Sequence, residues 1–212
     1  MHQNLENAIA AELRKALFNV VLLGYPGAGC GTQARRLAAK YHLSYVSSRE
    51  LIRNEIDGGT EIGQAVKPIF DRGGLVPDEI VIKLIERRFR EHPEALGFVF
   101  KGFPRTIVQA YILDGMLRKM GSSVSCVVDI QLSMLELIKR LDARGKTDRR
   151  MSYDLETATI VKRLEEHEQK CLPLVGYYQK HLTVTAISGE GTEDEVFARL
   201  AGPVEQAWRR AR

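Results

Sequence analysis

The chain has 212 residues and a net charge of +4, with 44% hydrophobic and 27% charged residues. This length suits one α/β domain with a buried core, and it argues against two independent domains. No apolar run approaches the roughly 20 residues of a membrane span, and the start lacks the basic-then-apolar design of a signal peptide. We therefore expect a cytoplasmic protein. Three widely spaced cysteines argue against a disulfide framework or a zinc site.

The basic residues are dispersed along the chain. No run of them alternates with aromatic residues, as nucleic-acid-binding segments often do. A small polyanionic substrate explains the positive excess at least as well. We therefore expect no nucleic-acid partner and no membrane partner.

The first 17 residues have the pattern of an amphipathic helix. Leu5, Ile9, Leu13 and Leu17 recur every four positions, which places them on one helical face. We interpret residues 1–17 as an N-terminal helical extension that packs on the body of the protein. A helix that binds a partner or a second copy is the alternative.

Strands and helices alternate through the rest of the chain. Strands are predicted at residues 18–23, 44–47, 98–100, 124–130 and 182–187. Helices are predicted at residues 31–41, 60–72 and 77–90, and the basic residues of the first are expected to face outward. Another helix is predicted to begin at Ser48 as its cap, one after residue 106 to end at about 119, and one after the strand at 124–130 to run through Arg140. A long helix interrupted near Pro173 and a last helix from about residue 192 complete the prediction. The polar stretch 143–154 has little to bury and is predicted to be a mobile connection. This alternation predicts a parallel sheet with helices on both faces.

A glycine-rich stretch, Gly24-Tyr25-Pro26-Gly27-Ala28-Gly29-Cys30-Gly31-Thr32-Gln33, follows the first strand. Its glycines permit positive φ angles and a close approach of the backbone, and Pro26 stiffens the turn. A strand, a glycine turn and a helix in this order aim backbone N–H groups at one point, where a phosphate binds. The lysine usual in such loops is replaced by Cys30. The sequence therefore predicts an anion cradle without its charged side chain.

Four separated stretches between residue 18 and about residue 190 resemble adenylate kinases. The glycine-rich stretch resembles the family's Gly-x-Pro-Gly-x-Gly-Lys-Gly-Thr-Gln. Residues 97–106 resemble Gly-Phe-x-x-Asp-Gly-Phe-Pro-Arg-Thr, and residues 46–53 resemble Ile-Ser-Thr-Gly-Asp-Met-Leu-Arg. The fourth stretch is a series of arginines at the spacing of the family's lid, namely Arg140, Arg144, Arg150 and Arg163.

The resemblance implies a fold of the P-loop nucleoside triphosphate hydrolase type over residues 18–212. This fold is an α/β domain with a parallel sheet of about five strands and helices on both faces. It would carry two small insertions, a monophosphate-binding region at about 47–76 and a short lid at about 143–154. The implied reaction is ATP + AMP to 2 ADP, with Mg²⁺ accompanying ATP. The implied partners are ATP, AMP and ADP, and the implied state is a monomer.

The resemblance also assigns roles to single residues. The ATP phosphates would be held by Gly27, Ala28, Gly29, Cys30, Gly31 and Thr32. The AMP site would contain Ser48, Arg53, Val76, Gly102, Arg105 and Gln109. The groups acting on the transferred phosphoryl would be Lys101, Arg105, Arg140, Arg144, Arg150 and Arg163. Guanidinium groups suit this reaction, because it mainly requires two anions to be positioned and their charge neutralised. Gln109 would read the base, which favours adenine without excluding another monophosphate.

Several functional positions depart from the family pattern. Cys30 replaces the loop lysine, Lys101 replaces an aspartate that holds Mg²⁺ through water, and Arg49 replaces a glycine. Ser152 and Tyr153 stand where the family has paired aspartates. We therefore expect reduced activity, and the alternative is an inactive nucleotide-binding or regulatory protein of the same fold.

Two of these departures allow competing interpretations. The ammonium of Lys101 either fills the space of the missing loop lysine, or that charge is simply lost. Mg²⁺ would then be held by phosphate oxygens and water, without a metal site on the protein. Cys30 is either a reactive thiol, activated by its position at a helix terminus, or an inert residue that fills the gap.

Overall fold

The structure is a computed structural model that describes residues 17–148, 150–151 and 154–211. Its centre is one five-stranded sheet in the order β2-β3-β1-β4-β5, in which every neighbouring pair is parallel. The strands are β1 (Val20–Gly24), β2 (Ser44–Ser47), β3 (Phe98–Lys101), β4 (Cys126–Gln131) and β5 (Val184–Ser188). The predicted parallel sheet is confirmed.

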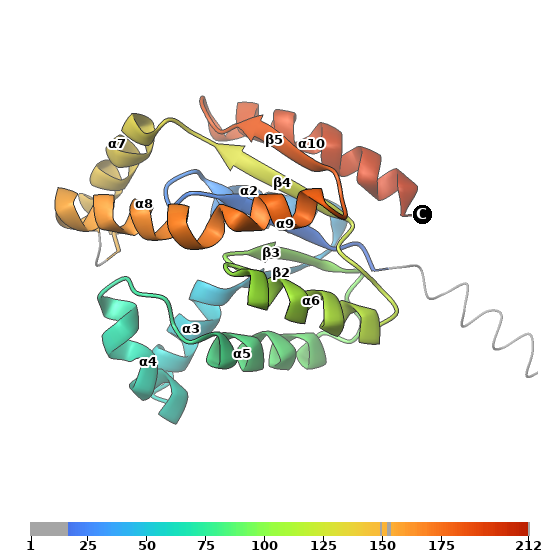
Figure 1. Cartoon of the computed structure of the whole chain (residues 1–212), viewed down its shortest axis with the longest axis horizontal. Helices are drawn as coiled ribbons and strands as arrows, with labels where there is room; N and C mark the ends of the chain where they lie inside the picture. Colours follow the sequence, from blue (N-terminus) through green and yellow to red (C-terminus); the bar gives the residue numbers. More distant parts are fainter. Residues whose placement is uncertain (1–16, 149, 152–153, 212) are drawn as a thin grey trace, which may run out of the picture.

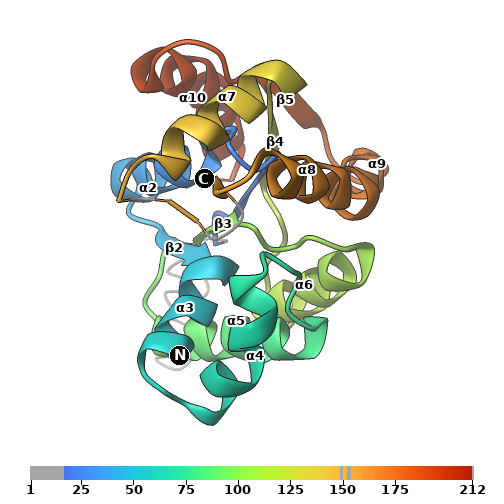
Figure 2. The same ribbon diagram turned by 90° about the vertical axis from the view of Figure 1, so that its left-hand side faces the viewer.

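Helices cover both faces of the sheet (Figures 1 and 2). They are α2 (Cys30–Tyr41), α3 (Ser48–Asp57), α4 (Glu61–Asp71), α5 (Asp78–Glu91), α6 (Ile107–Lys119), α7 (Met134–Gly145), α8 (Thr157–Cys171), α9 (Pro173–Gln179) and α10 (Glu193–Arg210). This arrangement is the α/β fold expected from the alternation of strands and helices. The predicted extension at residues 1–17 lies outside the described residues, apart from Leu17.

Successive side chains of each strand contribute to two different hydrophobic clusters, one on each face of the sheet. Val20 and Leu22 of β1 belong to a cluster that includes residues of α2, α7, α8 and α10, whereas Val21 belongs to one that includes residues of α3, α4, α5, α6 and α9. Successive side chains of a strand point to opposite faces, so a strand buried on both faces reads as a continuous apolar run. The central position of β1 follows from this run, since Val20 and Val21 are both fully buried.

The carboxyl ends of the strands meet at the edge where the insertions lie. In Figure 1 this edge is on the left, with α7 and α8 above it and α3 and α4 below it. In a parallel sheet, the loops at this edge are the usual place for a ligand. The sequence therefore places its glycine-rich loop where the fold binds ligands.

Three local predictions need correction. Ser47, rather than Ser48, caps α3, and its side chain accepts a hydrogen bond from the N–H of Glu50. Helix α7 continues past Arg140 to Gly145, so the connection that follows it is shorter than predicted. Within that connection Asp154 is buried, because its carboxylate bonds Arg144 and the N–H of Met151. The predicted lack of anything to bury there is wrong at Asp154.

No helix within the described ranges is long and apolar enough to span a bilayer.

Candidate functional site

The glycine-rich loop joins β1 to α2 at the carboxyl edge of the sheet. Gly29 precedes α2 with φ +87°, and it provides no side-chain cap for the first turn. Gly24 has φ +146°, and a Cβ there would lie 2.7 Å from the carbonyl oxygen of Ile130. Only glycine suits these two positions. The uncapped N–H groups of the first turn of α2, together with its dipole, make the loop an anion site.

Cys30 turns its side chain away from this anion site. Its thiol donates a 3.4 Å hydrogen bond to the carbonyl oxygen of Leu23, at the end of β1. Burial raises the pKa of the Cys30 thiol to about 11, although nearby Lys101 acts in the opposite direction. A thiol with this pKa stays protonated at neutral pH. The interpretation of Cys30 as an activated thiol at a helix terminus is therefore wrong, and the inert-filler interpretation agrees with its burial.

A cavity of about 620 Å³ lies beside the loop. Its walls come from the loop, α2, α3, the end of β3, α7, α8 and the connection between α7 and α8. The cationic side chains that line it are Arg35, Arg49, Arg53, Lys101, Arg105, Arg140, Arg144 and Arg163. The lining carboxylates are Glu50, Asp129 and Asp148. The strong excess of cations suits a polyanionic ligand.

Lys101 ends β3 and lies against the start of α2. A Cβ added to Gly31 would come 3.9 Å from the Cε of Lys101, so the lysine stem reaches the glycine-rich loop. Burial is the main cause that lowers the pKa of Lys101 to about 8, and the charges of Arg105 and Arg49 add to the effect. The ammonium is thus a charged group at neutral pH, on a side chain whose stem lies near the loop that lacks its own lysine.

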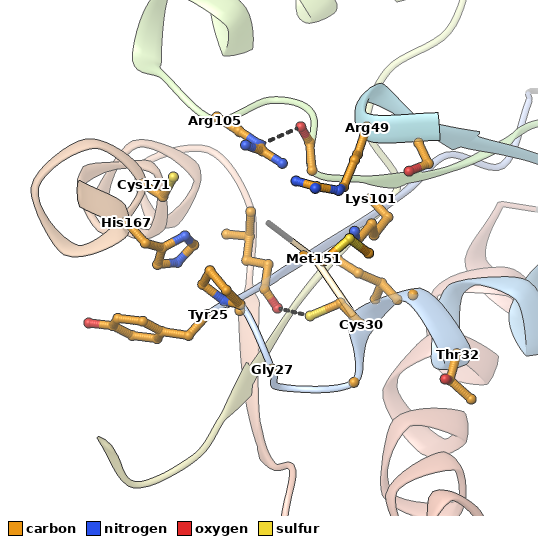
Figure 3. A pocket seen from close by; sticks show the side chains of 18 of the residues that line it. Tyr25, Gly27, Cys30, Thr32, Arg49, Lys101, Arg105, Met151, His167 and Cys171 are labelled. Atoms are coloured by element: carbon orange, nitrogen blue, oxygen red, sulfur yellow. Dashed lines mark hydrogen bonds between the residues drawn. The ribbon is translucent and has the colours of Figure 1, made fainter. Parts of the chain in front are cut away.

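Two arginines point into the same part of the cavity as Lys101 (Figure 3). Arg105 follows β3, and its Nε donates a 2.9 Å hydrogen bond to the carbonyl oxygen of Gly102. Arg49 belongs to the first turn of α3, and its guanidinium carbon lies 4.5 Å from the ring centre of Phe70. A guanidinium over an aromatic face is held by a cation–π attraction. These contacts fix both side chains from different segments of the fold.

Three of the four predicted lid arginines line the cavity. Arg144 makes two 2.7 Å hydrogen bonds to the carboxylate of Asp154. Arg140 bonds Glu136 at 2.8 Å, and Arg163 bonds Glu166 at 3.2 Å. Arg150 is exposed and is not among the lining residues. The structure therefore brings three of these arginines to the site but not the fourth.

The residues predicted to hold the ATP phosphates all belong to the glycine-rich stretch, residues 24–33. Gly27, Gly29, Cys30, Gly31 and Thr32 line the cavity. Ala28, which belongs to the same loop, is buried and does not line the cavity.

The predicted AMP residues divide between two cavities. Ser48, Val76, Gly102, Arg105 and Gln109 line a second cavity of about 20 Å³, which Arg49 and Phe70 also border. Arg53 lies in the larger cavity, where its Nη2 is 3.5 Å from the sulfur of Met151.

Gln109 already uses both ends of its amide. Its Nε2 donates to Asp78 at 2.7 Å, and its Oε1 accepts from the N–H of Arg105 at 2.8 Å. The predicted reading of the base by Gln109 would require it to exchange one of these bonds.

The adenylate kinase family model matches residues 22–183. The chain belongs to the adenylate kinase family. The chain is similar to an adenylate kinase from Bacteroides thetaiotaomicron, with 37% identity over 190 residues, or 90% of this chain and 100% of the relative. An adenylate kinase from Thermus thermophilus is 39% identical over 181 residues, which cover 85% of this chain and 94% of the relative. An adenylate kinase from Parabacteroides distasonis is 39% identical over 184 residues, which cover 87% of this chain and 96% of the relative.

The Mg²⁺ ion that the adenylate kinase family implies does not fit the side chains present. Lys101 occupies the position of the family's aspartate. Among the carboxylates of the cavity, Glu50 forms an ion pair with Arg35 and accepts from Tyr45, and Asp129 accepts from Gln131 at 2.9 Å. In the described part of the chain, no group of three or more histidine, cysteine, aspartate or glutamate side chains has a metal-binding arrangement. The third lining carboxylate, Asp148, lies between α7 and α8. This chain thus has the cation Lys101 at the position where the resemblance implies a carboxylate for Mg²⁺.

The structure adds site residues that sequence reasoning missed. Tyr25 of the glycine-rich loop stacks on His167 of α8 with ring centres 4.5 Å apart, and both line the cavity. His167 comes four residues after Arg163, a spacing that places the two on one helical face and could have revealed it. Arg35 is exposed, as expected for the basic residues of α2, and it also lines the cavity.

Proposed function

We propose that this member of the adenylate kinase family transfers the γ-phosphoryl group of ATP to AMP and forms two molecules of ADP. The observation that carries the proposal is the cation-lined cavity beside an uncapped helix terminus, with walls from both insertions. An oxygen of the AMP phosphate attacks the γ-phosphorus, and the bond from that phosphorus to its bridging oxygen breaks. The released electron pair stays on the β-phosphate, so both products are ADP.

The side chains divide the work between the two substrates. The glycine-rich loop and Thr32 hold the ATP phosphates, and Lys101 supplies the charge that Cys30 cannot. Arg53 and Arg105 hold the AMP phosphate. Arg140, Arg144 and Arg163 neutralise charge on the transferred group once nucleotide replaces their carboxylate partners, and Arg150 joins them when the lid closes. Support comes from the positions of these side chains, with the exception of Arg150, around one cavity. ATP is the donor nucleotide, and Mg²⁺ acts mainly through phosphate oxygens and water if it takes part.

We also infer that the rate is lower than in relatives with the loop lysine. Removing one positioned charge from such a site commonly costs on the order of 10²- to 10³-fold, or about 3 to 4 kcal/mol. The placement of Lys101 against Gly31 recovers part of this loss. Binding should suffer less than turnover, because backbone N–H groups supply most of the cradle.

The test is the initial rate of ADP formation from ATP and AMP by the purified chain. Arg105→Ala should lower that rate by about 100-fold or more, whereas Arg118→Ala on the exposed face of α6 should leave it unchanged. A rate that persists in Arg105→Ala would indicate a contaminating kinase. Nucleotide binding without any turnover would replace the proposal with the inactive, nucleotide-binding alternative.

A monomer in the cytoplasm remains our prediction for the native state. Its support is the sequence alone, and gel filtration tests the monomer against the chain mass of 23.9 kDa.

A further inference from the structure

Three residues that line the large cavity differ in charge from the pattern that the sequence resembles. Where the family pattern has a cation, an anion and a neutral glycine, this chain has the neutral Cys30 and the two cations Lys101 and Arg49. The family's three residues sum to zero charge, and those of this chain sum to +2. The difference equals the charge of one divalent metal ion.

The two added cations lie beside the phosphate cradle rather than on the outer surface. Lys101 is half-buried with its stem against Gly31 at the start of α2, and Arg49 is held over Phe70. Both line the large cavity, and Figure 3 shows them directed into the same region as Arg105. The cations come from β3 and α3, two neighbouring segments, so their separation is fixed by the sheet pairing of Ser47 with Lys101.

Two of the three carboxylates that line the cavity are engaged by other side chains, and the third, Asp148, lies in the connection between α7 and α8. Glu50 is engaged by Arg35 and Tyr45, and Asp129 is engaged by Gln131. A divalent ion on the ATP phosphates would therefore meet the charges of Lys101 and Arg49, while Glu50 and Asp129 already accept bonds from other side chains. Like charges at short range in a partly buried site repel strongly.

We propose that Lys101 and Arg49 replace Mg²⁺ in this protein, so that metal-free ATP is the preferred phosphoryl donor. This inference rests on the proposed function for its catalytic part. Metal-free ATP and AMP carry charges of −4 and −2, and two ADP molecules carry −3 each, so the transfer balances without a metal ion or a net proton. The ammonium and guanidinium neutralise the β- and γ-phosphate oxygens while the bond to the bridging oxygen breaks.

Two measurements on the wild-type chain test the proposal. The first is the rate of ADP formation in EDTA and in excess Mg²⁺, and we expect the rate in EDTA to stay within about tenfold of the rate in Mg²⁺. The second is calorimetric titration with ATP alone, in EDTA or in Mg²⁺, and we expect metal-free ATP to bind about tenfold more tightly or better. A contaminating metal-dependent kinase would be silent in EDTA.

The variant Lys101→Asp/Arg49→Gly restores the family residues at both positions and should reverse the preference. It should bind ATP more tightly with Mg²⁺ than without it. Lys119→Asp/Arg118→Gly makes the same charge change on the exposed face of α6 and should keep the wild-type preference. A melting curve checks that the first variant is folded, and if it is not, the wild-type titration decides.

The outcomes separate the two proposals. Tighter binding of ATP with Mg²⁺ to the wild-type chain, or a rate in EDTA that falls by more than about 100-fold, overturns metal replacement and leaves the transferase proposal intact. Absence of ADP formation both in EDTA and in Mg²⁺ overturns the transferase proposal. The relative affinity for ATP with and without Mg²⁺ then decides whether Lys101 and Arg49 replace the metal. An unchanged preference in Lys101→Asp/Arg49→Gly also overturns metal replacement.

Discussion

The ammonium of Lys101 has a lowered pKa, because it is desolvated and lies near other positive charges. Burial and the guanidiniums of Arg105 and Arg49 lower its pKa to about 8, against the opposing influence of Cys30 and Glu50. The ammonium is therefore charged below about pH 8 and is lost as the pH rises through that value. A role in holding ATP phosphates would make the activity of the free enzyme follow this titration.

We therefore predict that kcat/KM for ATP falls above about pH 8. Lys101→Arg keeps a charge at every relevant pH, so its profile should remain flat to a higher pH. Initial rates between pH 6 and 10 at subsaturating ATP give both profiles. The same midpoint in the two proteins would show that another group controls the fall.

His167 affects stability because the folded protein keeps it neutral. Burial is the main cause that lowers its pKa to about 3, and the charges of Arg105 and Arg163 contribute. In the unfolded chain a histidine binds a proton as the pH falls through about 6.5. The unfolded state then holds more protons than the folded state, so the free energy of unfolding decreases as the pH drops below about 6.5.

His167→Phe should remove this loss of stability and keep a ring against Tyr25. Between pH 7 and pH 5 the wild-type chain should lose about 1 to 2 kcal/mol more than the variant. Urea unfolding at the two pH values measures the difference. Parallel losses in both proteins would refute the account of His167.

Helices α3 and α4 form a unit that positions two arginines of the site. Gly63 of α4 packs against α3 so closely that an added Cβ would lie 2.1 Å from the backbone oxygen of Glu55. Backbone cannot yield as a flexible side chain can, so the two helices must separate to admit a methyl group. Arg49 and Arg53 are carried by α3 and would move with it.

Gly63→Ala should lower the free energy of unfolding by about 1 to 3 kcal/mol and raise the KM for AMP. Gly115→Ala in α6 is the matched control, because no atom lies within 4 Å of its added Cβ and alanine favours a helix. The control should be neutral, or more stable by up to about 1 kcal/mol. Equal effects of the two changes on stability would contradict the packing argument.

The sequence predicted most helices and strands, but not the end of α7 or the burial of Asp154 in the connection that follows it. Apolar periodicity marked the strands and the cores of the helices, because local pattern follows burial. The extension of α7 to Gly145 and the burial of Asp154 depend on a pairing between Asp154 and Arg144. A polar stretch gives no local sign of such a pairing, since the burial of its carboxylate is decided by a partner in another segment.

Across the whole molecule, the fold was more predictable than the contacts within the cavity. The parallel sheet and the glycine-rich loop follow from continuous apolar runs and from a motif whose geometry requires glycine. The contact of Arg49 with Phe70 joins segments 21 positions apart, and that of Tyr25 with His167 joins segments 142 positions apart. Such contacts arise only when the whole chain is folded. The roles of single residues at the site remain predictions.

The measurement that tests the central claim most directly is the rate of ADP formation by three proteins at neutral pH: wild type, Lys101→Ala and Cys30→Ala. The account predicts a loss on the order of 10²- to 10³-fold for Lys101→Ala, because the stem of this lysine lies against Gly31 of the loop. It predicts a loss below about threefold for Cys30→Ala, because that thiol is uncharged and bonds the carbonyl oxygen of Leu23. Equal and small effects of both changes would contradict the claim that Lys101 replaces the loop lysine.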